Sequence, residues 1–274
     1  MMRKLIFSAF LAIAACMSCS AQFYGVDVDK LSLLFKQAGK LPYDNAMIVM
    51  NSTMTALSQN PQGYRKALEL AENQLGNTAD SLHNEELYIA CLEHAASSFV
   101  LGSSEKERPK MLLEMAKKNR IGTTAADIEY VTPDGKEHHL NEPCEQYTLL
   151  YFNDPDCDAC QKVKANMEQS TTLKSLVDQA LLRVVAIYPD NNQKLWKKSK
   201  FPAWMVNGWD KKQAIENDGT YILPATLPVF YLLAPDNTVL MKNEPSLKRI
   251  EGALSRVMTS SDKDPQSLAK MLFN

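Results

Sequence analysis

Apolar residues recur every three to four positions from residue 27 to about residue 118, which is the period of amphipathic helices. The first face, Leu31, Leu34, Phe35 and Ala38, stops at Gly39, and a second contains Met47, Met50, Met54 and Leu57. A third helix should end at Gly76, and a fifth should begin at Ser104. The fourth is capped by Asn84 and should turn inward Leu87, Cys91, Leu92, Ala95 and Phe99. The pattern predicts an all-helical domain, which we place at 22–120.

The pattern changes to short strands and turns from residue 125 onward. Ile128, Tyr130 and a turn at 133–135 predict a hairpin, which precedes a buried strand at 147–152. Further strands are predicted at 181–188, 229–233 and 238–241, and helices at 161–167, 192–198 and 246–257. This order of a β-α-β unit, a hairpin and a closing helix predicts an α/β domain over 121–260, followed by a C-terminal tail over 261–274.

The first 21 residues carry the features of a signal peptide. Arg3 and Lys4 precede an apolar run, Leu5 to Ala15, which is too brief to span a bilayer. Residues 13–16 resemble a bacterial lipobox, which would make Cys16 a lipidated N-terminus, whereas cleavage after Ala21 would release a soluble periplasmic protein. We favour the lipid anchor and expect a periplasm-facing protein in a compartment where disulfides persist.

Composition narrows the function classes only slightly. A net charge of -2 with interspersed signs offers no basic stripe for nucleic acid and no polybasic membrane patch. Of six cysteines, two lie in the predicted signal peptide, and only two of the other four are closely paired, so this is not a disulfide scaffold. We expect no cofactor.

The pair Cys157 and Cys160 is the strongest chemical signal, because this CxxC follows a buried strand and precedes a helix. A thiolate at the first cysteine is stabilised by the helix N-terminus, and the second thiol lies one turn later on the same face. Leu227 and Pro228 precede another strand, and a cis bond before the proline could bring backbone close to the sulfurs. The spacing favours redox cycling; the alternatives are a static disulfide and half of a zinc site.

No metal is expected, because zinc would need two further ligands. The candidates Cys91, Cys144, His138 and His139 show no second paired spacing, and a copper carrier of the Sco type would need a histidine downstream of His139, where the sequence has none. We assign the histidines no role.

The carboxylates of Asp154, Asp156 and Asp158 surround Cys157 in the sequence. They oppose formation of a thiolate, whereas the helix N-terminus favours it. Because strong oxidants are sites whose reduced form is unusually stabilised, this acidic setting predicts a low reduction potential and a reductase.

Residues 121–258 resemble the thioredoxin fold, especially exported thiol:disulfide oxidoreductases of the TlpA and ResA type. The runs 149–157, 185–190 and 230–233 are similar to bacterial thioredoxin-like lipoproteins that carry a helical N-terminal domain of unknown function. The resemblance implies a central mixed β-sheet flanked by helices, preceded by the all-helical domain. It also implies that Cys157 attacks a disulfide, that Cys160 resolves the mixed disulfide, and that Leu227 and cis-Pro228 contact the substrate.

Three departures from the family pattern concern the same site. Asp156 stands where thioredoxins have a tryptophan, and Tyr151 stands where they have a buried acid, so the resolving proton transfer lacks its usual base. Val229 and Ala234 replace a threonine and an acid of the related lipoproteins, which puts the substrate contacts at that edge in doubt.

Other singled-out residues have simpler interpretations. Cys91 is expected to be a small buried residue rather than half of a disulfide with Cys144. Met47, Met50 and Met54 recur at helical spacing and are expected to belong to the core. Trp204 and Trp209 should pack a loop-rich insertion onto the sheet, with a partner groove as the alternative.

The sequence thus predicts an exported thiol:disulfide oxidoreductase. Its partners would be exported proteins with thiols or disulfides, and a membrane electron donor upstream. The competing hypothesis is an interaction protein whose helical domain binds a partner at the membrane surface, with the thioredoxin-like part as scaffold.

Overall fold

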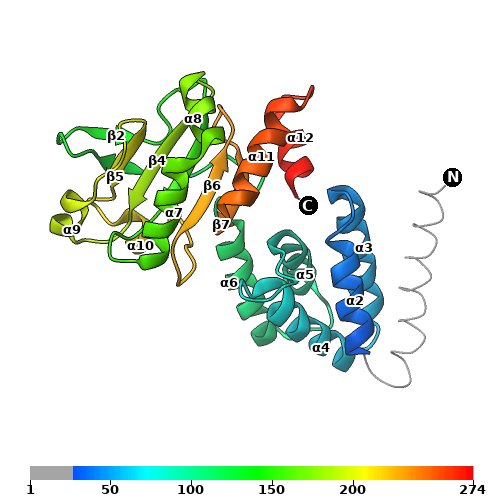
Figure 1. Ribbon diagram of the computed structural model, residues 1–274. Coiled ribbons are helices and arrows are strands. Elements are labelled where there is room, and N and C mark those ends of the chain that lie inside the picture. Colours follow the sequence, from blue (N-terminus) through cyan, green and yellow to red (C-terminus); the bar gives the residue numbers. More distant parts are fainter. Residues whose placement is uncertain (1–26, 274) are drawn as a thin grey trace. The chain divides into compact units, whose positions relative to one another are not determined.

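The computed structural model describes residues 27–273, which divide into two units, 27–117 and 118–273 (Figure 1). The predicted signal peptide and the lipidation site Cys16 lie outside the described residues. The boundary between the units lies three residues before the position predicted from the change in hydrophobic period.

The first unit is helical throughout, as predicted. Its elements are α2 (Val28–Ala38), α3 (Tyr43–Leu57), α4 (Pro61–Ala71), the π-helical turn η1 (Glu72–Gly76), α5 (Glu85–Ser97) and α6 (Ser103–Lys117). The side chains of Asp27, Asn60 and Asn84 accept hydrogen bonds from backbone N–H groups in the first turns of α2, α4 and α5. These caps satisfy donors that a helix start otherwise leaves unpaired.

The predicted core faces of this unit hold except at Met47, which is only half-buried, and at Phe99. Leu31, Leu34, Phe35 and Ala38 are all buried, as are Met50, Met54 and Leu57 on α3. The prediction that Phe99 turns inward is wrong, because its side chain is 103% exposed. Helix α5 ends at Ser97 and Ser98 is extended, so Phe99 no longer follows the helical period that places Ala95 in the core.

The second unit is built on a seven-stranded mixed sheet with strand order β2-β1-β5-β4-β3-β6-β7. The strands are β1 (Glu129–Val131), β2 (Glu137–His139), β3 (Tyr147–Phe152), β4 (Leu182–Tyr188), β5 (Met205–Trp209), β6 (Val229–Leu233) and β7 (Val239–Glu244). The helices are α7 (Asp158–Gln169), α8 (Thr171–Asp178), α9 (Gln193–Lys198), α10 (Ala214–Asn217), α11 (Leu247–Thr259) and α12 (Pro265–Leu272). Strands β3, β4 and β5 are parallel, whereas β6 runs antiparallel to β3.

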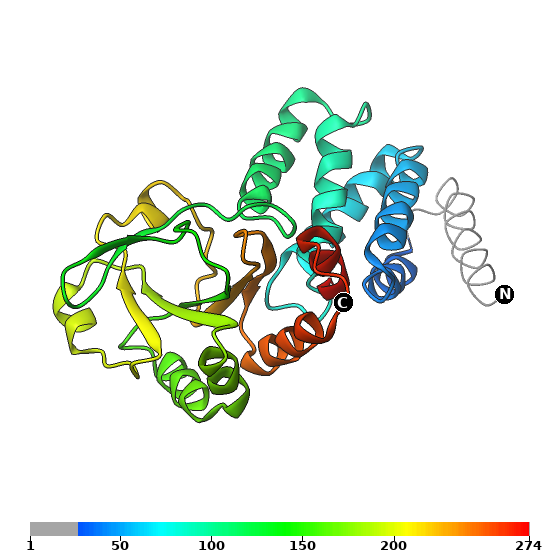
Figure 2. The same cartoon turned by 90° about the horizontal axis from the view of Figure 1, so that it is seen from above.

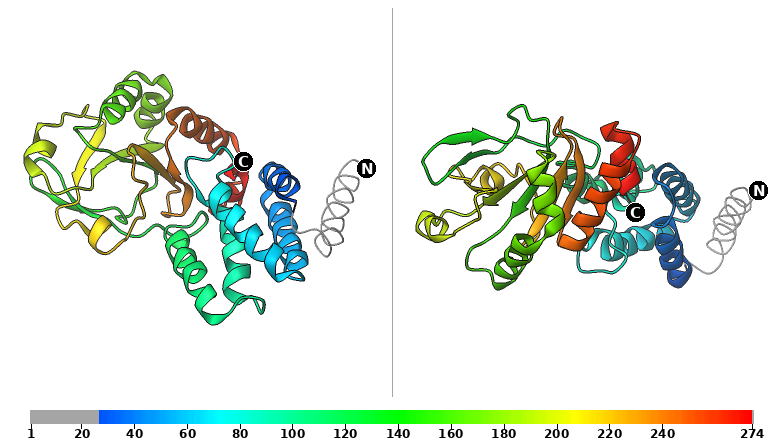
Figure 3. Two further views of the ribbon diagram at one scale, coloured as in Figure 1. Left: turned by 90° about the horizontal axis from the view of Figure 1, so that it is seen from below. Right: turned by 45° about the horizontal axis from the view of Figure 1, so that its top comes forward.

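The two faces of this sheet are covered by different elements. Leu149 and Tyr151 of β3 belong to the core beneath α7, α8, α11 and α12, whereas Leu150 and Phe152 belong to the core with Tyr130 and α10. Figure 2 shows the green helices α7 and α8 on the same side of the sheet as the orange α11, and both views of Figure 3 agree. The alternation follows the two-residue period of a strand, and both faces of the central strands are buried.

Two segments differ from the sequence-based expectations. The insertion predicted to be loop-rich contains β5, which pairs with β4 from Met205 to Trp209. A Cβ at Gly208 would lie 2.8 Å from side-chain atoms of Ile187 and Tyr130, so glycine permits this close approach. The segment predicted to be a tail contains α12, which buries Leu268, Ala269 and Leu272 in the core.

Candidate functional site

The loop between β3 and α7 is fixed at the carboxyl ends of the parallel strands. Asn153 donates its backbone N–H to the Ile187 carbonyl at 3.1 Å, and its buried Nδ2 donates to the carbonyls of Tyr151 and Ile187, both at 3.2 Å. Asp154 Oδ1 then accepts from the Asp156 N–H at 2.9 Å, and the Cys157 N–H donates to the Asp154 carbonyl at 3.1 Å. The position of Cys157 is therefore set by β3 and β4.

Cys157 is the N-cap residue of α7. Its Sγ accepts a hydrogen bond from the Cys160 N–H at 3.2 Å, and its thiol donates to the Leu227 carbonyl at 3.4 Å. Cys157 is half-buried, whereas Cys160 is only 3% exposed. Both are free thiols, so Cys157 is the sulfur that a partner can reach first.

The environment of Cys160 favours its protonated form. Burial raises the pKa of the Cys160 thiol, a backbone hydrogen bond from Asp154 lowers it, and the neighbouring Cys157 raises it. A thiol taken out of water loses the solvation that stabilises a thiolate. Cys160 is therefore a protonated thiol at neutral pH.

Leu227 lies beside Cys157, and Pro228 follows it in the chain. The peptide bond between them is cis, and Pro228 opens the antiparallel strand β6, whose Val229 pairs with Phe152 at the end of β3. The structure thus brings together the residues predicted from the sequence for this site, Cys157, Cys160, Leu227 and Pro228.

Tyr151 occupies the position beneath the first turn of α7. The side chain is fully buried, and its O–H donates to the Cys160 carbonyl at 2.7 Å. The ring stacks on Phe230, with centroids 5.2 Å apart. Burial raises the pKa of the phenol, so it stays protonated and acts as a donor at neutral pH. The sequence marks this position as unusual, but the contact with the Cys160 carbonyl is visible only in the fold.

The acidic surroundings of the site extend beyond the three aspartates of the CxxC loop. Asp190 follows β4, next to the end of β3. Burial, Asp190, Asp154 and Asp156 all raise the pKa of Tyr188, to about 12, so these carboxylates converge on that side chain. Sequence analysis missed Asp190, although parallel strands bring their carboxyl ends to one edge of a sheet.

The other cysteines lie in different settings. Cys91 is fully buried in the helical unit, and burial raises the pKa of its thiol to about 12. Cys144 is half-buried, and its sulfur accepts the Gln146 N–H at 3.4 Å. Both are free thiols in the structure.

Trp204 and Trp209 pack against neighbouring side chains. Trp209 stacks on Trp196 with centroids 5.4 Å apart, and its Nε1 donates to the Asp190 carbonyl at 2.9 Å. Trp204 is partly buried against the core beneath α7.

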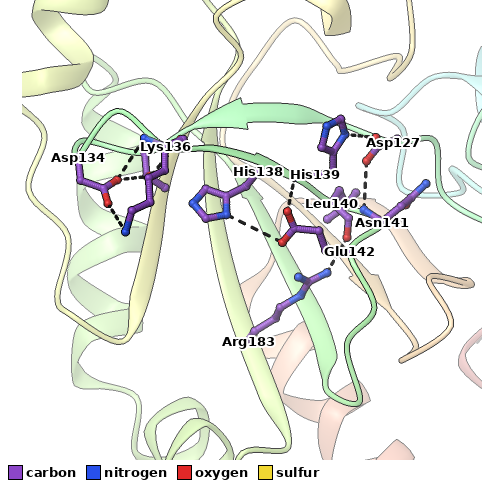
Figure 4. A network of polar contacts seen from close by, with 10 residues as sticks. Asp127, Asp134, Lys136, His138, His139, Leu140, Asn141, Glu142 and Arg183 are labelled. Carbon is purple, nitrogen blue, oxygen red and sulfur yellow. Dashed lines mark hydrogen bonds and ion pairs between the residues drawn. The ribbon is translucent and has the colours of Figure 1, made fainter.

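The paired histidines belong to a polar network along β2 (Figure 4). His139 Nδ1 lies 2.6 Å from Asp127 Oδ2, and His138 Nδ1 lies 3.9 Å from Glu142 Oε2. The Asp127 carboxylate raises the pKa of His139 through this contact. Within residues 27–273, no three histidine, cysteine or acidic side chains are grouped to hold a metal. Across the same residues, every helix is too short or too polar to cross a membrane.

Comparisons with known proteins cover both units. Residues 35–119 match the model of a domain of unknown function, DUF5106. A thioredoxin-like protein from Bacteroides caccae is 33% identical, with a TM-score of 0.74, and the match covers 83% of this chain and 81% of that one. No curated protein matches the sequence.

Two structures from Bacteroides fragilis match about half of the chain. The C-terminal domain of an uncharacterized protein is 35% identical with a TM-score of 0.48, and the match covers 50% of this chain and 99% of that one. A conserved protein of unknown function is 34% identical with a TM-score of 0.47, covering 49% and 98%.

Proposed function

Because the chain belongs to the thioredoxin-like proteins, we propose that it is an exported thiol:disulfide oxidoreductase that reduces disulfides in partner proteins. The observation that carries the proposal is the arrangement of the two thiols. An accessible Cys157 caps α7 with its sulfur, and a buried Cys160 follows one turn later. Disulfide exchange needs an accessible attacker and a second thiol within reach, and this arrangement supplies both.

The reaction proceeds by two exchanges. The Cys157 thiolate attacks one sulfur of the partner disulfide, a Cys157–partner bond forms, and the other partner sulfur leaves as a thiolate. The Cys160 sulfur then attacks Cys157 Sγ, which forms the Cys157–Cys160 disulfide and expels the second partner thiolate. Two electrons pass to the partner, and the two protons of the dithiol end on the two partner sulfurs.

The residues around the thiols have separate tasks in this scheme. The Cys160 N–H, at 3.2 Å from Cys157 Sγ, stabilises negative charge on the attacking sulfur. The raised pKa of Cys160 keeps this thiol protonated while the partner binds. The Leu227 carbonyl lies 3.4 Å from Cys157 Sγ, and Leu227 and Pro228 provide the backbone against which the partner segment lies.

The reductive direction rests on the charges at the site. Asp154, Asp156 and Asp158 lie within three residues of Cys157 and place negative charge near a sulfur that must itself become negative. This disfavours the reduced form relative to oxidising members of the class, so the dithiol gives up its electrons more readily. The partners would be exported proteins, and a membrane electron donor would restore the dithiol.

The direction is tested by the reduction potential of the pair. The protein is equilibrated with thiol buffers, and free cysteines are counted after alkylation. A potential near or below about -230 mV supports a reductase, whereas one near about -120 mV makes the protein an oxidant. A pair that never cycles excludes the oxidoreductase.

Within the family, we assign the chain to the TlpA and ResA type and to lipoproteins with a helical N-terminal domain. The match of residues 35–119 to a domain of unknown function supports the assignment to lipoproteins with a helical N-terminal domain.

The proposed anchor is a lipid on Cys16, in a sequence that resembles a lipobox. Fractionation tests it with a matched pair: Cys16→Ser should release the protein from the membrane, whereas Cys19→Ser should leave it attached. Equal release of both variants contradicts the anchor at Cys16.

A second candidate function is an interaction protein that uses the helical unit. Large apolar side chains are exposed mainly in this unit, namely Leu33, Ile48, Phe99, Met111 and Met115. Exposed apolar surface marks interaction sites when it is contiguous. If Phe99→Ser abolished the cellular phenotype while Cys157→Ser left it intact, the scaffold hypothesis would replace the enzyme.

A further inference from the structure

A cavity of about 370 Å³ opens beside the thiol site, on the side of the sheet away from α7. Its lining comes from the residues just after β4, from α10 and from the segment between α10 and β6. Leu227 belongs to this lining, and its carbonyl oxygen lies 3.4 Å from Cys157 Sγ. A side chain in the cavity would therefore lie within a residue or two of a partner sulfur bonded to Cys157.

The wall of the cavity is apolar and held in place. Ile215, Tyr221 and Leu223 line it together with Pro224 and Leu227. The Tyr221 O–H donates to the Ala126 carbonyl at 2.7 Å, and its ring lies 5.3 Å from that of Phe152. Buried Asp210 accepts the N–H groups of Ala214 and Ile215 at 3.1 and 2.9 Å, which fixes the start of α10. A preformed apolar cavity of this size accepts one large aliphatic or aromatic side chain.

The rim of the cavity is acidic. Asp190 and Glu216 line it and are exposed, and the exposed Asp156 and Asp158 flank Cys157. Lys118 lies close by with the opposite charge, since its Nζ donates to the carbonyl of Gly219 in the lining at 2.5 Å. Clustered carboxylates attract cationic ligands and repel anionic ones.

We propose that this cavity and its acidic rim select the substrate: a polypeptide whose disulfide cysteine lies next to a large apolar residue in a cationic segment. The inference rests on the proposed function, because the selected cysteine is the one that Cys157 attacks. The bond changes are those of the exchange reaction, and the cavity contributes only binding of the neighbouring side chain.

The test uses reduced protein and synthetic peptides with one cysteine, each joined through a disulfide to 5-thio-2-nitrobenzoate. Attack by Cys157 releases the coloured thiolate. One peptide has leucine beside the cysteine and two lysines; the second replaces leucine by glycine, and the third replaces both lysines by glutamate. The leucine peptide should react about tenfold or more faster than the glycine peptide, because the leucine side chain buries apolar surface in the cavity. The lysine peptide should react faster than the glutamate peptide, and added salt should reduce this difference.

Substitutions in the protein locate the selection. Glu216→Lys should lower the preference for lysine over glutamate about three- to tenfold at low salt. Asp178→Lys is the matched control, because this exposed residue precedes β4, at the end of the strand opposite Asp190. Ala225→Trp at the exposed rim should occupy the cavity and remove the preference for leucine, whereas Ala203→Trp, exposed and outside the lining, should preserve it.

The outcomes separate the inference from the proposed function. Equal rates for the three peptides, or equal effects of each substitution and its control, overturn the cavity as selector while exchange itself stands. Absence of release from every peptide, or unchanged release by Cys157→Ser, overturns the proposed function. Far-ultraviolet circular dichroism of each variant verifies that it is folded.

Discussion

Two buried thiols, one in each unit, have similar burial and different surroundings. Cys91 in the helical unit is 0% exposed and Cys160 on α7 is 3% exposed, and burial raises the pKa of both. Around Cys91, helix α5 buries Leu87, Leu92 and Ala95, and the nearby Tyr64 and Tyr88 also have raised pKa values. This is the setting of an inert core cysteine.

Cys160 differs from Cys91 in what lies one helical turn away. Cys157 caps the helix with its sulfur and is half-buried, and the Tyr151 O–H contacts the Cys160 carbonyl. The difference indicates that burial alone does not give a cysteine a redox role. A buried thiol becomes a resolving group when an accessible thiol precedes it at a helix N-terminus.

The largest expected effect on activity follows from replacing the accessible sulfur of the site. Cys157→Ser replaces the attacking thiol by a hydroxyl that is a far weaker nucleophile, so reduction of a model disulfide should fall below detection. Cys144→Ser is the control, because Cys144 is also a half-buried free thiol but lies outside the site. An insulin-reduction assay measures both. Loss of activity in both variants would show that the change acts through folding.

The next effect distinguishes the two buried thiols directly. Cys160→Ala leaves the first exchange intact but removes the group that breaks the Cys157–partner bond, so a mixed disulfide should accumulate. Cys91→Ala should accumulate none and should keep its activity, because it leaves both Cys157 and Cys160 in place as free thiols. Non-reducing gels with and without a thiol reductant measure the adduct. Equal trapping by both variants would contradict the assignment of Cys160.

Much of this comparison is readable in the sequence. The CxxC lies between a strand and a helix, and Cys91 lies on an apolar helical face, so the two environments follow from hydrophobic period alone. The same period predicts the α/β unit and the helical unit. The prediction for Phe99 is wrong because the end of α5 at Ser97 interrupts that period.

The features that the sequence-based predictions did not include depend either on tertiary pairing or on sequence signals that were overlooked. Strand β5 contains Asn207 and Gly208, which disfavour strands locally, and it forms because it pairs with β4. Helix α12 starts with an Asp264 cap and Pro265, signals that the sequence does contain. Asp190 was overlooked although it follows a predicted strand, whereas the cavity beside Leu227 is lined by segments far apart in the chain, so no local pattern reveals it.

A smaller effect concerns the stability that Cys91 contributes. Its pKa is raised by burial from 9.0 to about 12, so the folded state binds its proton more tightly than the unfolded chain. The resulting stabilisation is fully present below pH 9 and is lost as the pH rises toward 12, by about 1.4 kcal/mol per pH unit. Denaturant unfolding should therefore show the stability advantage of the wild type over Cys91→Ala shrinking above pH 9.

Subtracting the unfolding free energy of Cys91→Ala from that of the wild type removes the contributions of groups that titrate alike in both proteins. Tyr188 also has a pKa raised by burial, to about 12, and Cys91 does not contribute to that shift, so Tyr188 titrates in the wild type and in the variant alike. If the difference in unfolding free energy stays constant from pH 8 to pH 11, burial of Cys91 does not perturb its titration.

The smallest effect tests how the first turn of α7 is held. Tyr151→Phe removes only the O–H that donates to the Cys160 carbonyl at 2.7 Å, which should cost about 0.5–1.5 kcal/mol of stability. Tyr221→Phe is matched, because it removes a partly buried hydrogen bond of the same length, 2.7 Å, to the Ala126 carbonyl on the other face of the sheet. Both variants should lose similar stability, but only Tyr151→Phe should change the reduction potential and the rate of resolution. The pH profile of resolution should keep its shape, because the raised pKa of Tyr151 keeps the phenol protonated and thus a positioning group rather than a base. If the alkaline limb of that profile disappears in Tyr151→Phe alone, the phenol moves a proton and this assignment is wrong.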